Sequence, residues 1–387
     1  MGVFPFTDST ALRDDARALA DRLAEDGYLH VRGLLPESDV AAVRDHVLAL
    51  AREAGWLLPP DGAEPPLANP RATTWWPDPD YVALHDRMWR NRDLHALMHT
   101  PALLTLLGAL FGEPVLVHPR KVLRVVHPRC GTTPPETGWH QDYPGIQGSK
   151  RTLAAWTPLA PVEPGTGALT VLPGSHRAGL LPMRLSNDAM VGWEADTDTS
   201  TVHTGRLDPG DVIIFTVFTV HSGSANEGPR LRLSVDCRYQ PVGDPVCPGS
   251  LEFDDGKTWD DVYRTWPNGG RGDPLSYYWR RLPLTPADYD PSPDAARDHE
   301  VIAAAEAGNP DARRALRMIA VYGVDDAITS RAKALLRTLP VESRSVPGTS
   351  PGQFPAPRGE QPGEGERVLG ARAVPPSSRR STGSGGS

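Results

Sequence analysis

Apolar residues recur at helical spacing through the N-terminal part of the chain. Ala16, Leu19 and Leu23 are separated by three or four positions, which places them on one face of a helix. This spacing predicts helices over about 8–52. A short apolar stretch at 27–33 breaks the pattern and predicts a strand within this region.

Polar and proline-rich positions mark where the next elements begin and end. Ser38 or Asp39 is the expected N-cap of a second helix that runs through Leu50. Residues 54–80 are rich in Pro, Gly and Asp, so we expect a long loop there. A further helical region is expected over 82–111.

The pattern changes to short β-branched runs separated by turn residues over about 115–239. Short strands at this spacing indicate an antiparallel sandwich or barrel. We therefore expect a mainly β fold with flanking helices, a double-stranded β-helix (jelly roll, cupin-like) with a core at about 115–240 and the N-terminal helices packed on one sheet. The predicted strands are 114–117, 122–126, 152–157, 169–172, 211–217 and 231–238.

The C-terminal third changes character twice. The stretch 294–338 is rich in Ala and predicts a segment of two or three helices. From residue 341 onward Pro, Gly, Ser and Arg dominate, and too few apolar residues remain to offset the entropy of ordering, which predicts disorder. The predicted organisation is a main domain at 1–290, an accessory helical segment at 291–340 and a disordered tail at 341–387.

Composition excludes several classes of partner. The net charge of -8 argues against nucleic acid, because phosphate binding requires a basic surface. No uninterrupted apolar run of about 18 residues is present, so we expect no membrane span. The N-terminus lacks a signal-peptide pattern and the three cysteines form no disulfide framework. These features favour a cytoplasmic protein, and they leave its oligomeric state open.

Candidate metal ligands lie in the predicted β region. In His140-Gln141-Asp142 the first and third side chains point to one side of an extended segment, so both can reach one ion. His221, after the strand at 211–217, is the best third candidate. Two imidazoles and one carboxylate on one face leave three positions open, which suits Fe(II) with a bidentate cosubstrate and O2.

A candidate anion site follows eleven residues after His221. Arg232 and Ser234 are two positions apart on a predicted strand, so they face the same way. A guanidinium fork with a hydroxyl suits a buried carboxylate, such as the far carboxylate of 2-oxoglutarate. Arg230 faces the same way and is the alternative. Arg124, on an earlier strand, is expected either to bind an anionic substrate or to pair with a buried acid.

The order and spacing of these motifs resemble those of the phytanoyl-CoA dioxygenase family of Fe(II)/2-oxoglutarate oxygenases, over roughly residues 10–290. The matching segments are His140-Gln141-Asp142, Ala155-Trp156-Thr157, Gly167 through Leu172-Pro173-Gly174-Ser175-His176, Gly210-Asp211, His221-Ser222-Gly223-Ser224-Ala225-Asn226 and Arg232.

The resemblance implies a role for each matching residue. His140, Asp142 and His221 would bind the iron, and Arg232 with Ser234 would bind the C5 carboxylate of 2-oxoglutarate. Trp156 would lie against the cosubstrate. Lys121, on the strand before the metal motif, would contribute to the same pocket.

The resemblance also implies the reaction: hydroxylation of an unactivated C–H bond of a small molecule, with O2 and 2-oxoglutarate consumed. The Arg-rich, Lys-poor composition favours a bacterial source and hence specialised metabolism. The same centre could instead perform desaturation, epoxidation or oxidative cyclisation. From other classes, the alternatives are a non-catalytic jelly-roll binding protein with a vestigial metal site and a zinc hydrolase.

The substrate pocket is expected to come from three variable regions. These are the loop at 59–76, which carries Trp75 and Trp76, the stretch 183–203, and the region after Pro241. Aromatic residues in such loops occur as often in a core as in a pocket, so the sequence leaves the substrate undefined.

Overall fold

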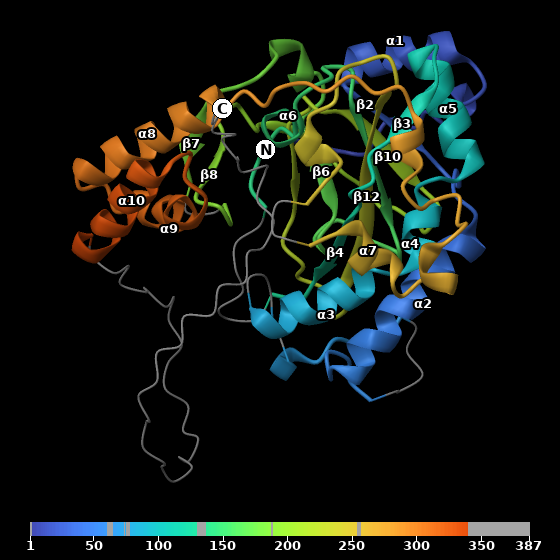
Figure 1. The fold of residues 1–387 in the computed structure, drawn as a ribbon, viewed down its shortest axis with the longest axis horizontal. Coiled ribbons are helices and arrows are strands. Elements are labelled where there is room, and N and C mark those ends of the chain that lie inside the picture. The colour runs from blue at the N-terminus through green and yellow to red at the C-terminus, as the bar shows by residue number, and fades with distance from the viewer. Residues whose placement is uncertain are drawn as a thin grey trace, which may run out of the picture.

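Two larger β-sheets, a two-stranded sheet and flanking helices make up the computed structural model, which describes residues 2–59, 65–72, 74, 78–129, 137–186, 189–253 and 257–339 (Figure 1). The helices are α1 (Ala16–Asp26), α2 (Glu37–Glu53), α3 (Pro79–Trp89), α4 (Arg92–Leu97), α5 (Pro101–Phe111), α6 (Tyr143–Ile146), α7 (Trp259–Tyr263), α8 (Ser292–Glu306), α9 (Ala312–Tyr322) and α10 (Asp326–Thr338). The strands are β1 (Gly2–Phe4), β2 (Tyr28–Val31), β3 (Val115–Val117), β4 (Val122–Val126), β5 (Leu153–Pro158), β6 (Leu169–Val171), β7 (Met183–Leu185), β8 (Trp193–Ala195), β9 (Thr201–His203), β10 (Val212–Thr216), β11 (His221–Gly223) and β12 (Arg232–Pro241).

The N-terminal helices and their strand follow the sequence pattern closely. The side chain of Asp15 accepts a hydrogen bond from the backbone N–H of Ala18 and caps α1. Gly27 ends α1 at φ 78°, a conformation that favours glycine, and β2 starts at the next residue. The predicted N-cap of α2 is wrong: Pro36 occupies that position, because its fixed φ suits a helix start where no N–H is needed.

The larger sheet has the strand order β2-β10-β5-β12-β3, and β4 also pairs with β12. Its pairs are antiparallel. One face, which includes Ile214, Ala155 and Val235, packs in the same core cluster as residues of α1, α2 and α5. The central strands β5 and β12 are buried along their whole lengths, because both of their faces are covered.

The opposite face of the larger sheet packs against the smaller sheet, whose order is β1-β9-β6-β11. Trp156 and Phe215 from the larger sheet share a core cluster with Leu169 and Val171 of β6. Five strands were not predicted, namely β1, β7, β8, β9 and β11. Each has three residues, which is too short for an alternating pattern to stand out.

The helical region predicted at 82–111 is divided into α3, α4 and α5. The stretch Arg92–Phe111 is apolar and long enough to cross a bilayer by length and composition alone. In the structure Leu94 and Leu103 are fully buried in the main core cluster. Burying such a leucine side chain contributes about 1.5–3 kcal/mol, so this apolar stretch has a role in the core.

The C-terminal helices α8, α9 and α10 form a bundle with its own core, which includes Val301, Leu316 and Leu335. Figure 1 shows this bundle beside the hairpin of β7 and β8, on the opposite side of the molecule from α5. Trp193 and Leu185 of the hairpin pack against the bundle. The predicted helical segment is therefore present, whereas the predicted disordered tail at 341–387 lies outside the described residues.

Candidate metal centre

His140 and His221 are brought together by their backbones. The N–H of each donates to the C=O of the other, at 3.0 Å in both directions, in an antiparallel bridge. β11 begins at His221 and is held on its other side by pairing with Val171 of β6. The two imidazole rings lie 4.2 Å apart between centroids. The histidine pair is therefore fixed by sheet pairing, even though the two residues are 81 positions apart in the sequence.

Each imidazole is oriented by a hydrogen bond from Nδ1. His140 Nδ1 donates to Gly138 O at 2.9 Å, and His221 Nδ1 donates to Thr219 O at 3.0 Å. A carbonyl can only accept, so Nδ1 carries the proton and Nε2 presents a lone pair. Burial lowers the pKa of both rings, that of His140 to about 3, and the neighbouring His221 contributes to the shift of His140. Both rings are thus neutral and ready to act as ligands.

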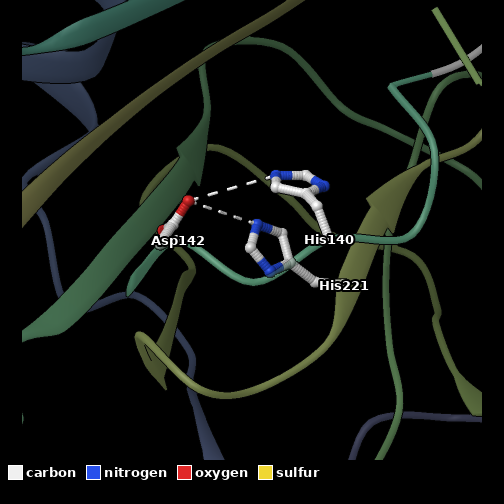
Figure 2. A group of neighbouring side chains, drawn as sticks. All are labelled: His140, Asp142 and His221. Carbon is white, nitrogen blue, oxygen red and sulfur yellow. Dashed lines mark ion pairs between the residues drawn. The ribbon is translucent and has the colours of Figure 1, made fainter. Parts of the chain in front are cut away.

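Asp142 completes the group directly before α6. Its Oδ1 lies 4.0 Å from His140 Nε2 and 3.9 Å from His221 Nε2 (Figure 2). One ligand atom from each of the three residues lies within 4.8 Å of the others. The chemistry of this donor set fits a ferrous ion, since two imidazoles and one carboxylate form a facial triad with open positions.

Gln141, between two of these residues, points elsewhere and fixes the segment. Its amide nitrogen donates to Gly179 O and Phe218 O, each at 2.7 Å, and its oxygen accepts from Leu181 N at 2.8 Å. Side chains alternate along an extended segment, so His140 and Asp142 point into the site, whereas Gln141 points away and hydrogen-bonds to the surrounding loops.

A buried charge cluster lies beneath the carboxylate. Arg238 on β12 contacts Asp142 Oδ2 through Nη2 at 2.8 Å and Nε at 3.2 Å, and it also bonds to Asp236. Burial by itself raises the pKa of Asp142, but the charge and hydrogen bonds of Arg238 outweigh it and hold that pKa below its usual range. The sequence interpretation missed Arg238. Alternation along β12 was the available signal, because it places 232, 234, 236 and 238 on one face.

Arg232 lies beside the histidines in a small cavity. Arg124, His140, Trp156 and His221 are among the residues that line the cavity with it. Arg124 also pairs with the buried acid Asp236, at 3.5 Å, which was one of its two predicted alternatives.

The guanidinium of Arg232 is incompletely satisfied. Nη1 donates to Ser234 Oγ at 2.6 Å, while the buried Nε has no partner. Burial, with repulsion from Arg124, lowers the pKa of Arg232 to about 9. The buried cation of Arg232, with one unpartnered donor, favours an anion here, since an unpaired buried charge is costly.

The other two candidates lie apart from this small cavity. Arg230 Nε donates to Pro65 O at 2.7 Å, so its side chain is held by the loop outside the site. Lys121 is buried, and its Nζ donates to His118 O at 2.8 Å and to Tyr278 Oη at 3.4 Å. It lines a larger cavity instead.

That larger cavity has a volume of about 1130 Å³ and starts at His140 and Asp142. All three regions expected to form a substrate pocket contribute to it: the second supplies Met183, Met190 and Trp193, and the third supplies residues after Pro241. From the first region Thr74 lines the cavity, whereas Trp75 and Trp76 lie outside the described residues. Residues of α8 and α9 also line it, which the sequence did not indicate.

Comparison with known proteins gives matches at the level of family and sequence. A family model described as Phytanoyl-CoA dioxygenase (PhyH) matches residues 23–234, more than half of the chain. The 1-deoxypentalenic acid 11-beta-hydroxylase of Streptomyces exfoliatus is 30% identical over 252 residues, covering 61% of this chain and 85% of the relative. The enzyme of the same name from Streptomyces arenae is 28% identical over 250 residues, with the same coverage. Among solved structures, the epimerase SnoN in complex with Fe3+, alpha ketoglutarate and nogalamycin RO is 20% identical, with a TM-score of 0.46, and covers 63% of this chain and 92% of that one.

Proposed function

Since the chain belongs to the phytanoyl-CoA dioxygenase family and is an Fe(II)/2-oxoglutarate-dependent oxygenase, we propose that it hydroxylates an unactivated C–H bond of a small molecule. The relatives named as hydroxylases of 1-deoxypentalenic acid come from Streptomyces, which supports a role in bacterial specialised metabolism. The observation that carries the proposal is the triad of His140, Asp142 and His221 beside the buried, incompletely satisfied Arg232.

In this proposal His140, Asp142 and His221 hold the iron. Their protonation states suit that role, because both imidazoles are neutral with Nε2 available and Asp142 is kept ionised by Arg238. When bound, Fe(II) together with 2-oxoglutarate and O2 supplies an oxidant strong enough for an unactivated C–H bond. The protein residues supply orientation and a pocket from which water is excluded.

Arg232 and Ser234 are proposed to bind the C5 carboxylate of 2-oxoglutarate. The free Nε of Arg232 and its lowered pKa support this role, because an incoming carboxylate would both accept the unused hydrogen bond and stabilise the cation. Trp156 lines the same small cavity and would form its wall. Lys121 lines the larger cavity, so any contribution that it makes to the cosubstrate pocket would come from that side.

The arrangement of the chain is part of the same proposal. We propose that the two facing sheets are the halves of a double-stranded β-helix and that residues 1–290 form the oxygenase domain. Residues 291–340 would be an accessory helical segment and 341–387 a tail. The buried free thiols of Cys237 and Cys247 agree with a reducing compartment, and we propose the cytoplasm.

The alternative outcomes use the same iron centre. Desaturation, epoxidation or oxidative cyclisation would follow from a different substrate position. A vestigial binding protein would have no use for a cosubstrate clamp, and a zinc hydrolase would need neither Arg232 nor oxygen. These alternatives therefore differ in succinate formation and in their need for O2.

The test is a succinate-release assay with purified protein, Fe(II), 2-oxoglutarate and candidate metabolites, with and without O2. We expect succinate only when Fe(II), 2-oxoglutarate, O2 and the substrate are all present, and a product that gains one oxygen atom. A product that loses two hydrogens would indicate desaturation or ring closure. Asp142→Ala and His221→Ala should each abolish succinate formation, because each removes a ligand. Wild-type succinate formation by either variant would overturn the assignment.

A further inference from the structure

The cavity at the metal centre is larger than one cosubstrate requires. Its volume of about 1130 Å³ exceeds the roughly 300–1,000 Å³ of ordinary small-molecule sites. It extends from Asp142 to residues of α8 and α9, including Arg297, Met318 and Tyr322. The family match ends at residue 234, so these helices lie outside the matched part of the chain. A segment beyond that match therefore forms part of the cavity wall.

The C-terminal bundle is attached close to the metal motif. Gln147, just after α6, donates through Nε2 to Asp290 O at 2.8 Å and accepts from Asp290 N at 2.7 Å. Tyr289 Oη donates to Pro144 O at 3.2 Å in the same region. These bonds join the segment before α8 to the residues that follow Asp142. The start of α8 is consequently fixed relative to the metal site.

A second attachment joins the bundle to the hairpin of β7 and β8. The Arg297 guanidinium lies over the Trp193 ring, 4.4 Å from its centroid, and it is held there by Asp294 and Asp298, each at 2.6 Å. At Gly192 a Cβ would lie only 2.2 Å from Ala315 N, so the hairpin backbone touches α9 directly. Two separate attachments give the wall a defined position.

The two ends of the cavity differ in character. At the metal end, Arg124 and Arg238 are among the lining residues. At the far end, Met318, Ile319 and Tyr322 of α9 line the cavity, as do Met190 and Val191. On the α8 side Arg297 is paired with Asp294 and Asp298, and Glu300 also lines the cavity, so the apolar surface is the one that α9 and residues 190–191 provide. This apolar surface favours a ligand with a bulky apolar part, and methionines adapt to irregular shapes.

We propose that α8 and α9 form the distal wall of the substrate cavity, and that this cavity selects a bulky, largely apolar molecule whose far part packs on Met318 and Tyr322. The inference rests on the proposed function, because it identifies the ligand of the cavity as the molecule that is oxidised. It assigns to the accessory segment a part in substrate selection.

The probe is 1-anilinonaphthalene-8-sulfonate, a bulky apolar dye whose fluorescence rises in apolar sites, titrated into the full chain without iron or oxygen. Met318→Trp fills the distal end and should weaken dye binding about tenfold or more. Val321→Trp is the matched control: Val321 lies on the same helix with 63% of its surface exposed and does not line the cavity. This control should bind the dye like the wild type.

Met318→Ser provides a second variant if the tryptophan variant does not fold, as judged from its melting temperature. It removes apolar contact without adding volume and should weaken dye binding about threefold. Equal affinity in the wild type and the folded Met318 variants, or an equal loss in Val321→Trp, would overturn the inference. Succinate formation by the wild type tests the proposed function on its own, so a failed dye test and a failed oxygenase assay can be told apart.

Discussion

The guanidinium of Arg238 holds one carboxylate oxygen of Asp142 and leaves the other facing the two histidines. Nη2 and Nε of Arg238 lie 2.8 and 3.2 Å from Oδ2, whereas Oδ1 is the atom close to His140 and His221. A carboxylate held in this way would offer an ion Oδ1. Arg238 would thus leave open the coordination positions that a bidentate carboxylate would occupy.

Replacing Arg238 should weaken metal binding through Asp142. Arg238→Gln should lower Fe(II) affinity and 2-oxoglutarate turnover by about 10–100-fold, the usual effect of losing a hydrogen-bond partner of a metal ligand. Arg238→Lys keeps the charge but loses the fork, so we expect an intermediate value. Fe(II) titration by equilibrium dialysis measures the effect, with Arg206→Gln as an exposed control. Unchanged Fe(II) affinity in a folded Arg238→Gln variant would contradict this role.

Arg232 and Arg230 make a matched pair for testing the cosubstrate site. Arg232→Gln should raise the KM for 2-oxoglutarate by about 10–100-fold, because a hydrogen bond to a charged group contributes about 1.5–3 kcal/mol. Arg230→Gln should leave that KM near the wild-type value, since Arg230 bonds to Pro65 O away from the cavity. Succinate formation at varied 2-oxoglutarate concentration gives both constants. The reverse ranking would assign the clamp to Arg230.

The contact between the hairpin and α9 can be tested with two glycines. Gly192 and Gly308 both have positive φ, at 88° and 80°, so alanine costs about 1 kcal/mol at either site. A Cβ at Gly192 would also meet the Ala315 backbone, whereas one at Gly308 meets nothing within 4 Å. Gly192→Ala should therefore lower the free energy of unfolding by about 1–3 kcal/mol more than Gly308→Ala. Urea denaturation measures the difference. If both variants lose the same free energy of unfolding, α9 shifts away from the added Cβ without cost, which would contradict a tight contact.

Buried histidines predict acid sensitivity of the metal-free protein. Burial lowers the pKa of His95 to about 3 and that of His118 to about 4. The unfolded chain binds protons below about pH 6.5, while the folded protein leaves these rings neutral, so stability falls as the pH falls. Each ring can contribute up to about 1.4 kcal/mol per pH unit between pH 6.5 and pH 4.

Urea denaturation at pH 7 and pH 5 measures this loss. Ordinary carboxylates titrate near pH 4, so between pH 7 and pH 5 the change in unfolding free energy comes mainly from histidine. An unfolding free energy that is constant across that interval would contradict the expectation.

The sequence by itself determined the parts that depend on short spacing. His-x-Asp puts 140 and 142 on one side of an extended segment, and Arg-x-Ser does the same for 232 and 234, because alternation along an extended chain is local geometry. His140, Asp142 and His221 were predicted to lie together, and they do. The helices before residue 112 and the longer strands also follow from local periodicity.

Tertiary structure alone decided which groups meet across the fold. The different surroundings of Arg230 and Arg232, the pairing of Arg238 with Asp142, and the position of Lys121 depend on how strands and loops pack. The same is true of α8 and α9, whose sequence specifies helices but not the surface on which they dock. Docking depends on side-chain fit between distant segments, such as Arg297 on Trp193, which no local pattern contains.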